Sequence, residues 1–178
     1  TTPKVRYYSM GDNQWKTSQQ WPPKAAQETR LYLRSNGRAN SVFGDGKLSF
    51  SAPGNEPVDS VAYDPKNPVQ TIGGGDCCNG GVVVPGAFDQ RPAEVRHDVL
   101  VYTSDVLKEP VTVAGFVDAI LHVSSDAKDT DFAVKLVDGE RKVVYGEDKE
   151  AKRGRPIATT YTDGNDLGGP ALLIADES

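Results

Sequence analysis

Residues 98–137 read DVLVYTSDVLKEPVTVAGFVDAILHVSSDAKDTDFAVKLV and contain three β-rich runs separated by short polar breaks. The runs are 98–104, 111–124 and 132–137, and each is rich in the β-branched and aromatic residues that strands favour. Gly115 interrupts the middle run, which indicates a bulge or a bend there. Side chains on a strand alternate between faces. Five apolar residues of the middle run share one parity and are expected to face a core: Val111, Val113, Val117, Leu121 and Val123.

The size and composition of the chain fit one compact all-β domain. The chain has 178 residues and 37% hydrophobic content, which is enough for a single core. It contains 18 Gly and 12 Pro, and its first two thirds show no sustained helical periodicity. This composition predicts many short strands joined by turns.

Charge and hydropathy exclude two classes of partner. The net charge of −5 and the pI near 5.0 argue against a nucleic-acid-binding domain, which usually carries a basic surplus. There is no apolar stretch of about 18 residues, and the mean hydropathy is −0.50, so no membrane span is expected. The chain begins at Thr1 without an initiator Met or a signal-peptide pattern, which favours a processed form or an excised piece. Nothing in the sequence indicates a compartment.

The first half of the chain contains shorter strand patterns. Residues 5–8, 28–34 and 47–51 are predicted strands, and Met10-Gly11-Asp12-Asn13 is a predicted turn. From Tyr63 to His97 the pattern disappears, and so long a connection inside a compact domain is usually functional or interfacial. Pro residues in this loop fix backbone angles, and an Arg flanked by carboxylates can lock a loop by bidentate hydrogen bonds.

Several separated motifs then resemble, in order, one known family of proteins. They are Met10-Gly11-Asp12-Asn13, Trp15, Trp21-Pro22, Leu31-Tyr32-Leu33, Tyr63-Asp64-Pro65, Asn67-Pro68, Asp89-Gln90-Arg91, Asp98 to Ser104, and Ser124 to Phe132. This set resembles the C-terminal domain of the X-Pro dipeptidyl-peptidase, cocaine-esterase and α-amino-acid ester hydrolase family of serine hydrolases. In that family an α/β-hydrolase domain carries the Ser-His-Asp triad, a helical cap covers it, and a C-terminal jelly-roll β-sandwich packs against both.

The resemblance implies a jelly-roll-like antiparallel β-sandwich of the galactose-binding-like kind. Residues 1–137 are expected to form this sandwich, and residues 138–178 are either its continuation or a divergent tail. The implied partner is an α/β-hydrolase catalytic domain of the same polypeptide, and a docking face without that domain would favour self-association. The residues expected to be largely buried in the sandwich are Val99, Val101, Val113, Val117, Leu121, Phe132, Val134 and Leu136.

No catalytic residue of the family transfers to this sequence. The nucleophile elbow G-x-S-x-G occurs nowhere in the chain. Only His97 and His122 could act as a general base, and neither has a recognisable Ser and acidic partner. The chain alone is therefore predicted to be non-catalytic. The residues predicted to act in loop architecture or at an interface are Tyr63, Asp64, Asp89, Gln90, Arg91, Trp15, Trp21 and Phe88.

Weaker patterns leave alternatives open. Asp126, Asp129 and Asp131 could bind a hard cation such as calcium, but they lack the spacing of a calcium-binding hand, and a polar turn is the plainer interpretation. Cys77 and Cys78 are adjacent and lack zinc-site spacing, so a reduced pair is expected. The glycines at 73–75 are not followed by the Lys-Ser/Thr of a phosphate-binding loop, and close backbone packing is predicted instead. No cofactor is predicted.

A second class of function stays open beside the accessory domain. Jelly rolls also serve as free-standing carbohydrate- or polymer-binding modules, and Trp15 with Trp21 could form a flat platform for sugar rings. The basic residues between Arg141 and Arg155 are interleaved with acidic ones, which is more typical of a solvated face than of a binding patch.

Overall fold

The computed structural model describes residues 2–10, 12–75, 84–141 and 168–177. Strands dominate its regular structure, and a single helical turn is the one helix among these residues. The strands form three antiparallel pairs, β1 with β2, β3 with β4, and β5 with β6. This confirms the predicted all-β, antiparallel sandwich class, whereas the jelly-roll order of strands stays a prediction. The elements are β1 (Val5–Ser9), β2 (Gln14–Ser18), β3 (Tyr32–Arg34), β4 (Lys47–Ser49), α1 (Arg91–Glu94), β5 (Val134–Arg141) and β6 (Gly168–Glu177).

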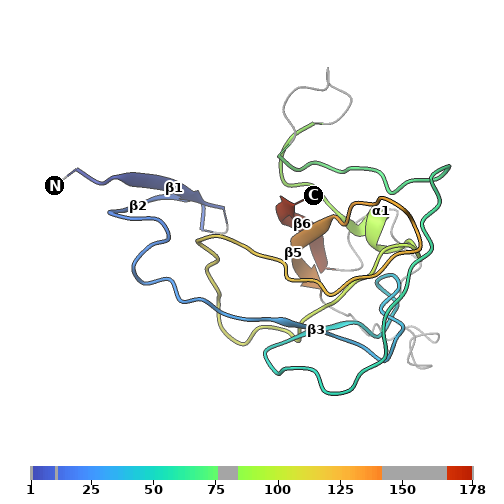
Figure 1. Cartoon of the computed structure of the whole chain (residues 1–178). Helices are drawn as coiled ribbons and strands as arrows, with labels where there is room; N and C mark the ends of the chain where they lie inside the picture. Colours follow the sequence, from blue (N-terminus) through green and yellow to red (C-terminus); the bar gives the residue numbers. More distant parts are fainter. Residues whose placement is uncertain (1, 11, 76–83, 142–167, 178) are drawn as a thin grey trace, which may run out of the picture.

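The first pair is a hairpin, which projects at one end of the molecule in Figure 1. Its register runs from Val5 opposite Ser18 to Ser9 opposite Gln14. The connecting turn contains Asn13 at φ 53°, a left-handed conformation that Asn tolerates better than most residues. The predicted strand 5–8 and the predicted turn are confirmed, and β2 is a strand that the sequence patterns did not indicate.

The second pair is extended by the chain around residue 100. Isolated bridges join Asn40 to Leu100 and Lys47 to Thr103. The N–H of Val101 donates to the carbonyl of Ala39 over 2.9 Å, and the N–H of Leu48 donates to the carbonyl of Thr103 over 3.0 Å. The predicted run 98–104 therefore lies against the β3–β4 region, although it forms bridges and not a continuous strand.

The interior of the described chain is mostly polar. Ala39 (0% exposed), Ser41 (1%) and Gln90 (1%) are its most buried residues. The remaining buried side chains come from residue 35 and from α1: Ser35, Arg91, Ala93 and Glu94. The core thus forms where the 35–46 loop, α1 and residues 99–103 meet.

The middle run, 111–124, is not a strand, and this corrects the central sequence prediction. In the described part of the chain, the one hydrogen bond that involves residues 104–133 runs from the N–H of Ala127 to Oγ of Ser125. Figure 1 shows this segment as a long trace, yellow to orange, that reaches β5 without an arrow. A strand needs a neighbour that pairs with its N–H and C=O groups, and no described segment supplies one.

The expected burial of eight apolar residues is also wrong. Val113 is 52% exposed and Phe132 is 44% exposed. The other six are half-buried: Val99, Val101, Val117, Leu121, Val134 and Leu136. Because the middle run is not paired, no second layer among the described residues covers its apolar side chains.

The third pair joins distant parts of the sequence. Val134 lies opposite Glu177 and Arg141 lies opposite Gly168, with register shifts between them. The predicted strand 132–137 is confirmed as β5, with different bounds. Lys135 of β5 donates from Nζ to Oε1 of Gln90 over 3.2 Å, which places this pair beside α1.

Candidate functional site

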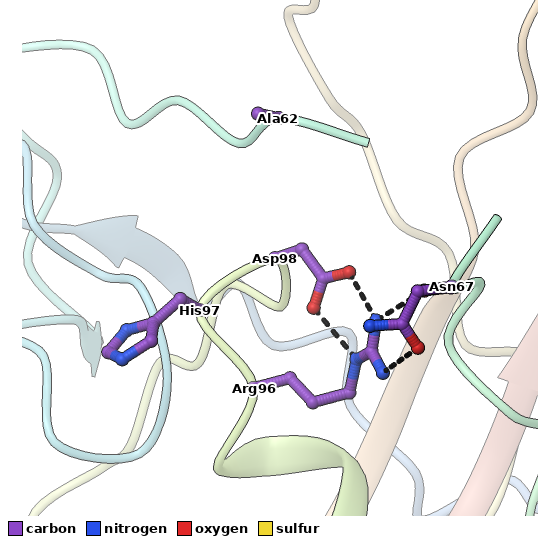
Figure 2. Close-up of a pocket in the computed structure, with 5 residues that line it drawn as sticks. All are labelled: Ala62, Asn67, Arg96, His97 and Asp98. Carbon is purple, nitrogen blue, oxygen red and sulfur yellow. Dashed lines mark hydrogen bonds and ion pairs between the residues drawn. The ribbon is translucent and has the colours of Figure 1, made fainter. Parts of the chain in front are cut away.

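A polar clamp around Arg96 lines the pocket shown in Figure 2. The guanidinium donates from Nε to Oδ1 of Asp98 over 2.8 Å and from Nη2 to Oδ2 over 2.6 Å. On its other side Nη2 donates to the carbonyl of Asn67 over 2.6 Å, and Nη1 donates to Oδ1 of Asn67 over 3.2 Å. The hydrogen bond from Arg96 holds the pKa of the Asp98 carboxyl below its usual range, and the same bond raises the pKa of Arg96. Arg96 therefore fastens the 64–67 turn to the segment that follows α1.

This pocket lacks the groups that a hydrolytic site requires. It is lined by Ala62, Asn67, Arg96, His97 and Asp98, none of which is a Ser or Cys nucleophile. The His97 ring points away from the Arg96–Asp98 pair in Figure 2, and no hydrogen bond joins the imidazole to a described residue. The polar side chains of the clamp already bind one another, so the pocket serves the architecture of the loop.

A second cluster surrounds Asp59. Its Oδ2 accepts hydrogen bonds from Oγ of Ser35 over 2.6 Å and from the hydroxyl of Tyr102 over 2.7 Å. Its Oδ1 accepts a hydrogen bond from the N–H of Ala39 over 2.9 Å. Burial raises the pKa of Asp59, but the hydrogen bonds from Ser35, Ala39 and Tyr102 outweigh it and lower the pKa below its ordinary value. One carboxylate thus joins three segments at the core.

The start of α1 brings together three of the residues predicted from the loop motif. Asp89 and Arg91 form a bidentate ion pair, in which Arg91 Nε donates to Oδ1 of the carboxylate over 2.9 Å and Nη2 donates to Oδ2. Between them, the Gln90 amide donates from Nε2 to the carbonyls of Ile72 (2.8 Å) and Phe88 (2.9 Å). With the bond from Lys135, Gln90 connects α1, β5 and the chain near residue 72.

The other two loop residues lie at the surface. Oδ1 of Asp64 accepts a hydrogen bond from the N–H of Lys66 over 2.9 Å, and the N–H of Asn67 donates to the Asp64 carbonyl over 3.0 Å. This is the turn that presents Asn67 to Arg96. Tyr63 is 67% exposed, so the turn carries an aromatic side chain to the solvent.

The predicted aromatic residues do not gather into one patch. Trp15 packs edge-on against Tyr8, with ring centroids 5.4 Å apart, and Trp21 packs in the same way against Tyr7 at 5.3 Å. Neighbouring residues 7 and 8 of β1 face opposite sides of the hairpin, so the two indoles do not form a shared platform. Phe88 lies instead beside Gly73, where an added Cβ would be 2.8 Å from its ring and 2.3 Å from the carbonyl of Gly86. The predicted close packing at the glycines is confirmed for Gly73 but not for Gly75, where no heavy atom of the described residues lies within 4 Å of an added Cβ.

The weaker metal candidates lie at the surface. Asp126, Asp129 and Asp131 are all exposed, and no cluster of three His, Cys, Asp or Glu side chains occurs among the described residues. His122 is also exposed. Cys77 and Cys78 and most of the basic run 141–155 lie outside the described residues. In the described ranges, no helix has the length and apolarity to cross a membrane.

The Asp59 cluster was missed by the sequence patterns. Its members are Ser35, Ala39, Asp59 and Tyr102, which are up to 67 positions apart and belong to no motif with a fixed spacing. Asp59 stands in a Pro- and Gly-containing segment, PGNEPVDS, that reads as an ordinary loop. The strand-like alternation of residues 99–103 was the one signal that Tyr102 lies on the opposite face from its neighbour Val101.

Comparison with known proteins identifies the class of this chain. Residues 1–167 match the X-Pro dipeptidyl-peptidase C-terminal non-catalytic domain, and the chain belongs to that family. It is 46% identical over 136 residues to the cocaine esterase of Rhodococcus sp. (strain MB1 Bresler), a match that covers 76% of this chain and 23% of the esterase. It is 31% identical over 153 residues to putative serine esterases of Mycobacterium bovis and Mycobacterium tuberculosis, covering 80% of this chain and 21% of each. The chain therefore spans less than a quarter of the length of these curated relatives.

Proposed function

We propose that this chain is the accessory C-terminal domain of a serine hydrolase, which supports an α/β-hydrolase catalytic domain and a wall of its substrate pocket. The observation that carries the proposal is the family match over residues 1–167, together with relatives that are named esterases and are more than four times as long as the matched segment. The chain has no nucleophile elbow of its own, so the chemistry has to come from another domain.

The 63–97 loop is the proposed docking surface for that catalytic domain. Residues 61–71 are exposed, yet Arg96 clamps the 64–67 turn and Gln90 holds the chain at Ile72. An exposed segment that is already fixed costs little conformational entropy when it docks. In this proposal Tyr63 and Asp64 reach toward the partner, and Asp89, Gln90 and Arg91 hold the loop in place.

The aromatic side chains at the surface extend this proposal. Trp15 is 59% exposed and Phe88 is 41% exposed, and large aromatic residues are enriched in protein interfaces. Trp21, at 38%, is the least exposed of the three. They occupy separate parts of the structure, so the proposed contact with the catalytic domain is broad and not one compact patch.

We also propose that residues 138–178 belong to the same domain as residues 1–137. β5 runs from Val134 to Arg141 and crosses the boundary between the two, and the family match continues to residue 167. A single domain in which β5 pairs with β6 agrees with both observations.

A chimera tests the proposed function. The segment of Rhodococcus cocaine esterase that matches this chain is replaced by the corresponding residues of this chain, and a version with the segment deleted serves as control. We expect the chimera to keep most of the thermal stability and ester hydrolysis of the unmodified esterase, whereas the deletion loses both. A chimera that is as unstable and inactive as the deletion would contradict the proposal.

The isolated chain provides the second arm of the test. We expect no turnover of p-nitrophenyl esters or of an X-Pro chromogenic substrate by the purified chain. Activity that copurifies in proportion to the chain and resists a serine-directed inhibitor would overturn the accessory role. Retention on an immobilised polysaccharide would support the alternative of a free-standing binding module, and loss of that retention in Trp15→Ala would assign it to the hairpin.

A further inference from the structure

The turn at residues 35–39 contains an Asn-Gly pair that the proposed function leaves unused. Asn36 is exposed, and its side chain makes no hydrogen bond to a described residue. Asn-Gly is the pair at which a side-chain amide is lost most readily, because a following residue without a Cβ leaves its backbone nitrogen free to approach the amide carbon. The chain contains a second such pair, Asn79-Gly80, which lies outside the described residues.

The reaction available to this pair needs water and no other reagent. The backbone nitrogen of Gly37 attacks Cγ of Asn36, and the bond from Cγ to the side-chain nitrogen breaks. That nitrogen leaves as ammonia, with the proton that the Gly37 nitrogen gives up. Water then opens the cyclic succinimide at either carbonyl, which yields aspartate or isoaspartate at position 36.

In the folded chain the attacking nitrogen is held by a hydrogen bond. The N–H of Gly37 donates to Oγ of Ser35 over 3.0 Å, and this Oγ donates in turn to Oδ2 of Asp59 over 2.6 Å. Gly37 is also closely packed, since an added Cβ would lie 3.1 Å from the Cβ of Pro57. Because the nitrogen has to lose its proton to react, a bond from its N–H to a fixed acceptor withholds the nucleophile.

Asn40, four positions further along, shows the contrast. Its Nδ2 donates to the carbonyls of Ser60 and His97, each over 2.9 Å, so its amide is held in place. The N–H of the next residue, Ser41, donates to a backbone carbonyl over 2.7 Å. Both reacting groups are therefore fixed at Asn40, whereas at Asn36 the amide is free and the neighbouring N–H alone is held.

We infer that Asn36 is a deamidation site, at which the reaction is controlled by the opening of the hydrogen bonds between Ser35 and Asp59. The isoaspartate product adds one carbon to the main chain between Ser35 and Ala39, both of which donate to the Asp59 carboxylate. Either product also adds a negative charge to a turn that already binds Glu56 through the N–H of Ser35. The modification therefore marks chains in which the turn has opened and hinders its closing. This inference concerns the chain by itself and does not rest on docking to a catalytic domain.

Peptide mapping of the full 178-residue chain by mass spectrometry tests the inference. The Asn79→Gln variant serves as the parent in every arm, so that Asn36 carries the remaining Asn-Gly pair. The parent is incubated in mildly alkaline buffer, either folded or unfolded by urea, and the aspartate and isoaspartate at position 36 are separated and quantified over time. We expect conversion to be about tenfold or more slower in the folded chain, because the turn has to open before Gly37 reacts.

Three substitutions in the parent separate the turn from the rest of the fold. Ser35→Ala removes the acceptor of the Gly37 N–H and should raise the rate in the folded chain by about fivefold or more. Ser49→Ala is the matched control, because the N–H of Ser51 donates to Oγ of Ser49 over 3.1 Å in the same way, and it should leave the rate unchanged. Arg91→Ala, which is expected to lower stability at α1, should also leave the rate unchanged.

Hydrogen exchange of the Gly37 amide in the folded parent is a measurement that needs no substitution in the turn, and this amide should exchange slowly. The inference is overturned by an unprotected Gly37 amide, by equal conversion of Asn36 in the folded and urea-unfolded parent, or by no conversion in either. It is also overturned if Ser35→Ala converts as slowly as the parent, or if Ser49→Ala or Arg91→Ala converts as fast as Ser35→Ala.

Discussion

Residues 35–103 and residues 104–133 both contain runs with a strand-like sequence pattern, but they differ in how their backbones are paired. The first region contains β4, three isolated bridges and the backbone bonds that join residues 39–48 to residues 99–103. The second region has a single hydrogen bond, at Ser125, within the described chain. The first is fixed by buried polar groups from distant positions, whereas the second has apolar alternation and no neighbour. Side-chain pattern alone therefore does not make a strand; a partner for its backbone does.

The largest expected effect concerns the carboxylate at the centre of the paired region. Asp59→Ala removes the acceptor for Ser35, Ala39 and Tyr102, and we expect it to lower the free energy of unfolding by about 3 kcal/mol. Asp118→Ala, in the unpaired region, should leave the melting temperature unchanged. Thermal and urea unfolding followed by circular dichroism measure both. Equal losses in the two variants would remove the distinction between the regions.

A smaller loss of stability is expected when an added methyl group crowds the same region. A Cβ on Gly46 would lie 2.1 Å from the carbonyl oxygen of Val101 and 2.9 Å from the Cβ of Ala39. Gly46→Ala should therefore cost about 2 kcal/mol of stability, because backbone atoms have to shift. Gly54→Ala is the control, since nothing lies within 4 Å of its Cβ, and it should be neutral. A neutral Gly46→Ala would show that residues 39–46 and 101 are not closely packed.

The ion pair at α1 is expected to have a more local effect. The Arg91 side chain is 11% exposed, so Arg91→Ala should cost about 1.5 kcal/mol and speed proteolysis within residues 63–97. Arg30, whose side chain is 77% exposed beside Glu28, provides the control, and Arg30→Ala should change neither property. If limited proteolysis of Arg91→Ala matches that of the unmodified chain, Asp89 and Arg91 have no architectural role in the loop.

The two smallest expected effects are dependences of stability on pH, and the first appears at alkaline pH. Burial and the hydrogen bond to Asp59 raise the pKa of Tyr102 above its ordinary value of 10.0. The folded chain therefore keeps this proton when the unfolded chain loses it, so the contribution is complete below pH 10 and is lost as the pH rises further. In urea unfolding above pH 10, the free energy of unfolding should decrease as the pH rises, and Tyr102→Phe should make this decrease smaller. An identical slope in both proteins would contradict the Tyr102–Asp59 contact.

The second effect concerns Asp59, the hydrogen-bond partner of Tyr102, and appears at acidic pH. Here the free energy of unfolding should decrease as the pH falls. Because the pKa of Asp59 is below 3.8 in the folded chain, its contribution is complete above pH 3.8 and is lost as the pH falls through the folded value. Asp59→Asn should flatten this part of the stability curve, while Asp118→Asn should leave it in place. A curve that Asp59→Asn does not change would exclude Asp59 as a titrating group of the core.

The sequence predicted the elements that depend on local pattern and missed those that depend on distant partners. Alternation and turn chemistry were sufficient for β1, β4 and the 10–13 turn, whereas the role of Asp89, Gln90 and Arg91 in loop architecture stays a prediction. Spacing could not show that Asp59 would meet Ser35 and Tyr102, because no periodicity links those positions. The same limit explains residues 111–124, where a strong strand pattern carried no information about a neighbouring strand.

Hydrogen exchange of the isolated chain tests the contrast between the two regions most directly. At a concentration where the chain sediments as a monomer, amides of Ser41, Val101 and Thr103 should exchange slowly, because each donates to a backbone carbonyl. Amides of residues 111–123 should exchange at the rate of an unstructured peptide under the same conditions. Comparable protection of 111–123 and of Ser41, Val101 and Thr103 in the monomer would contradict the account.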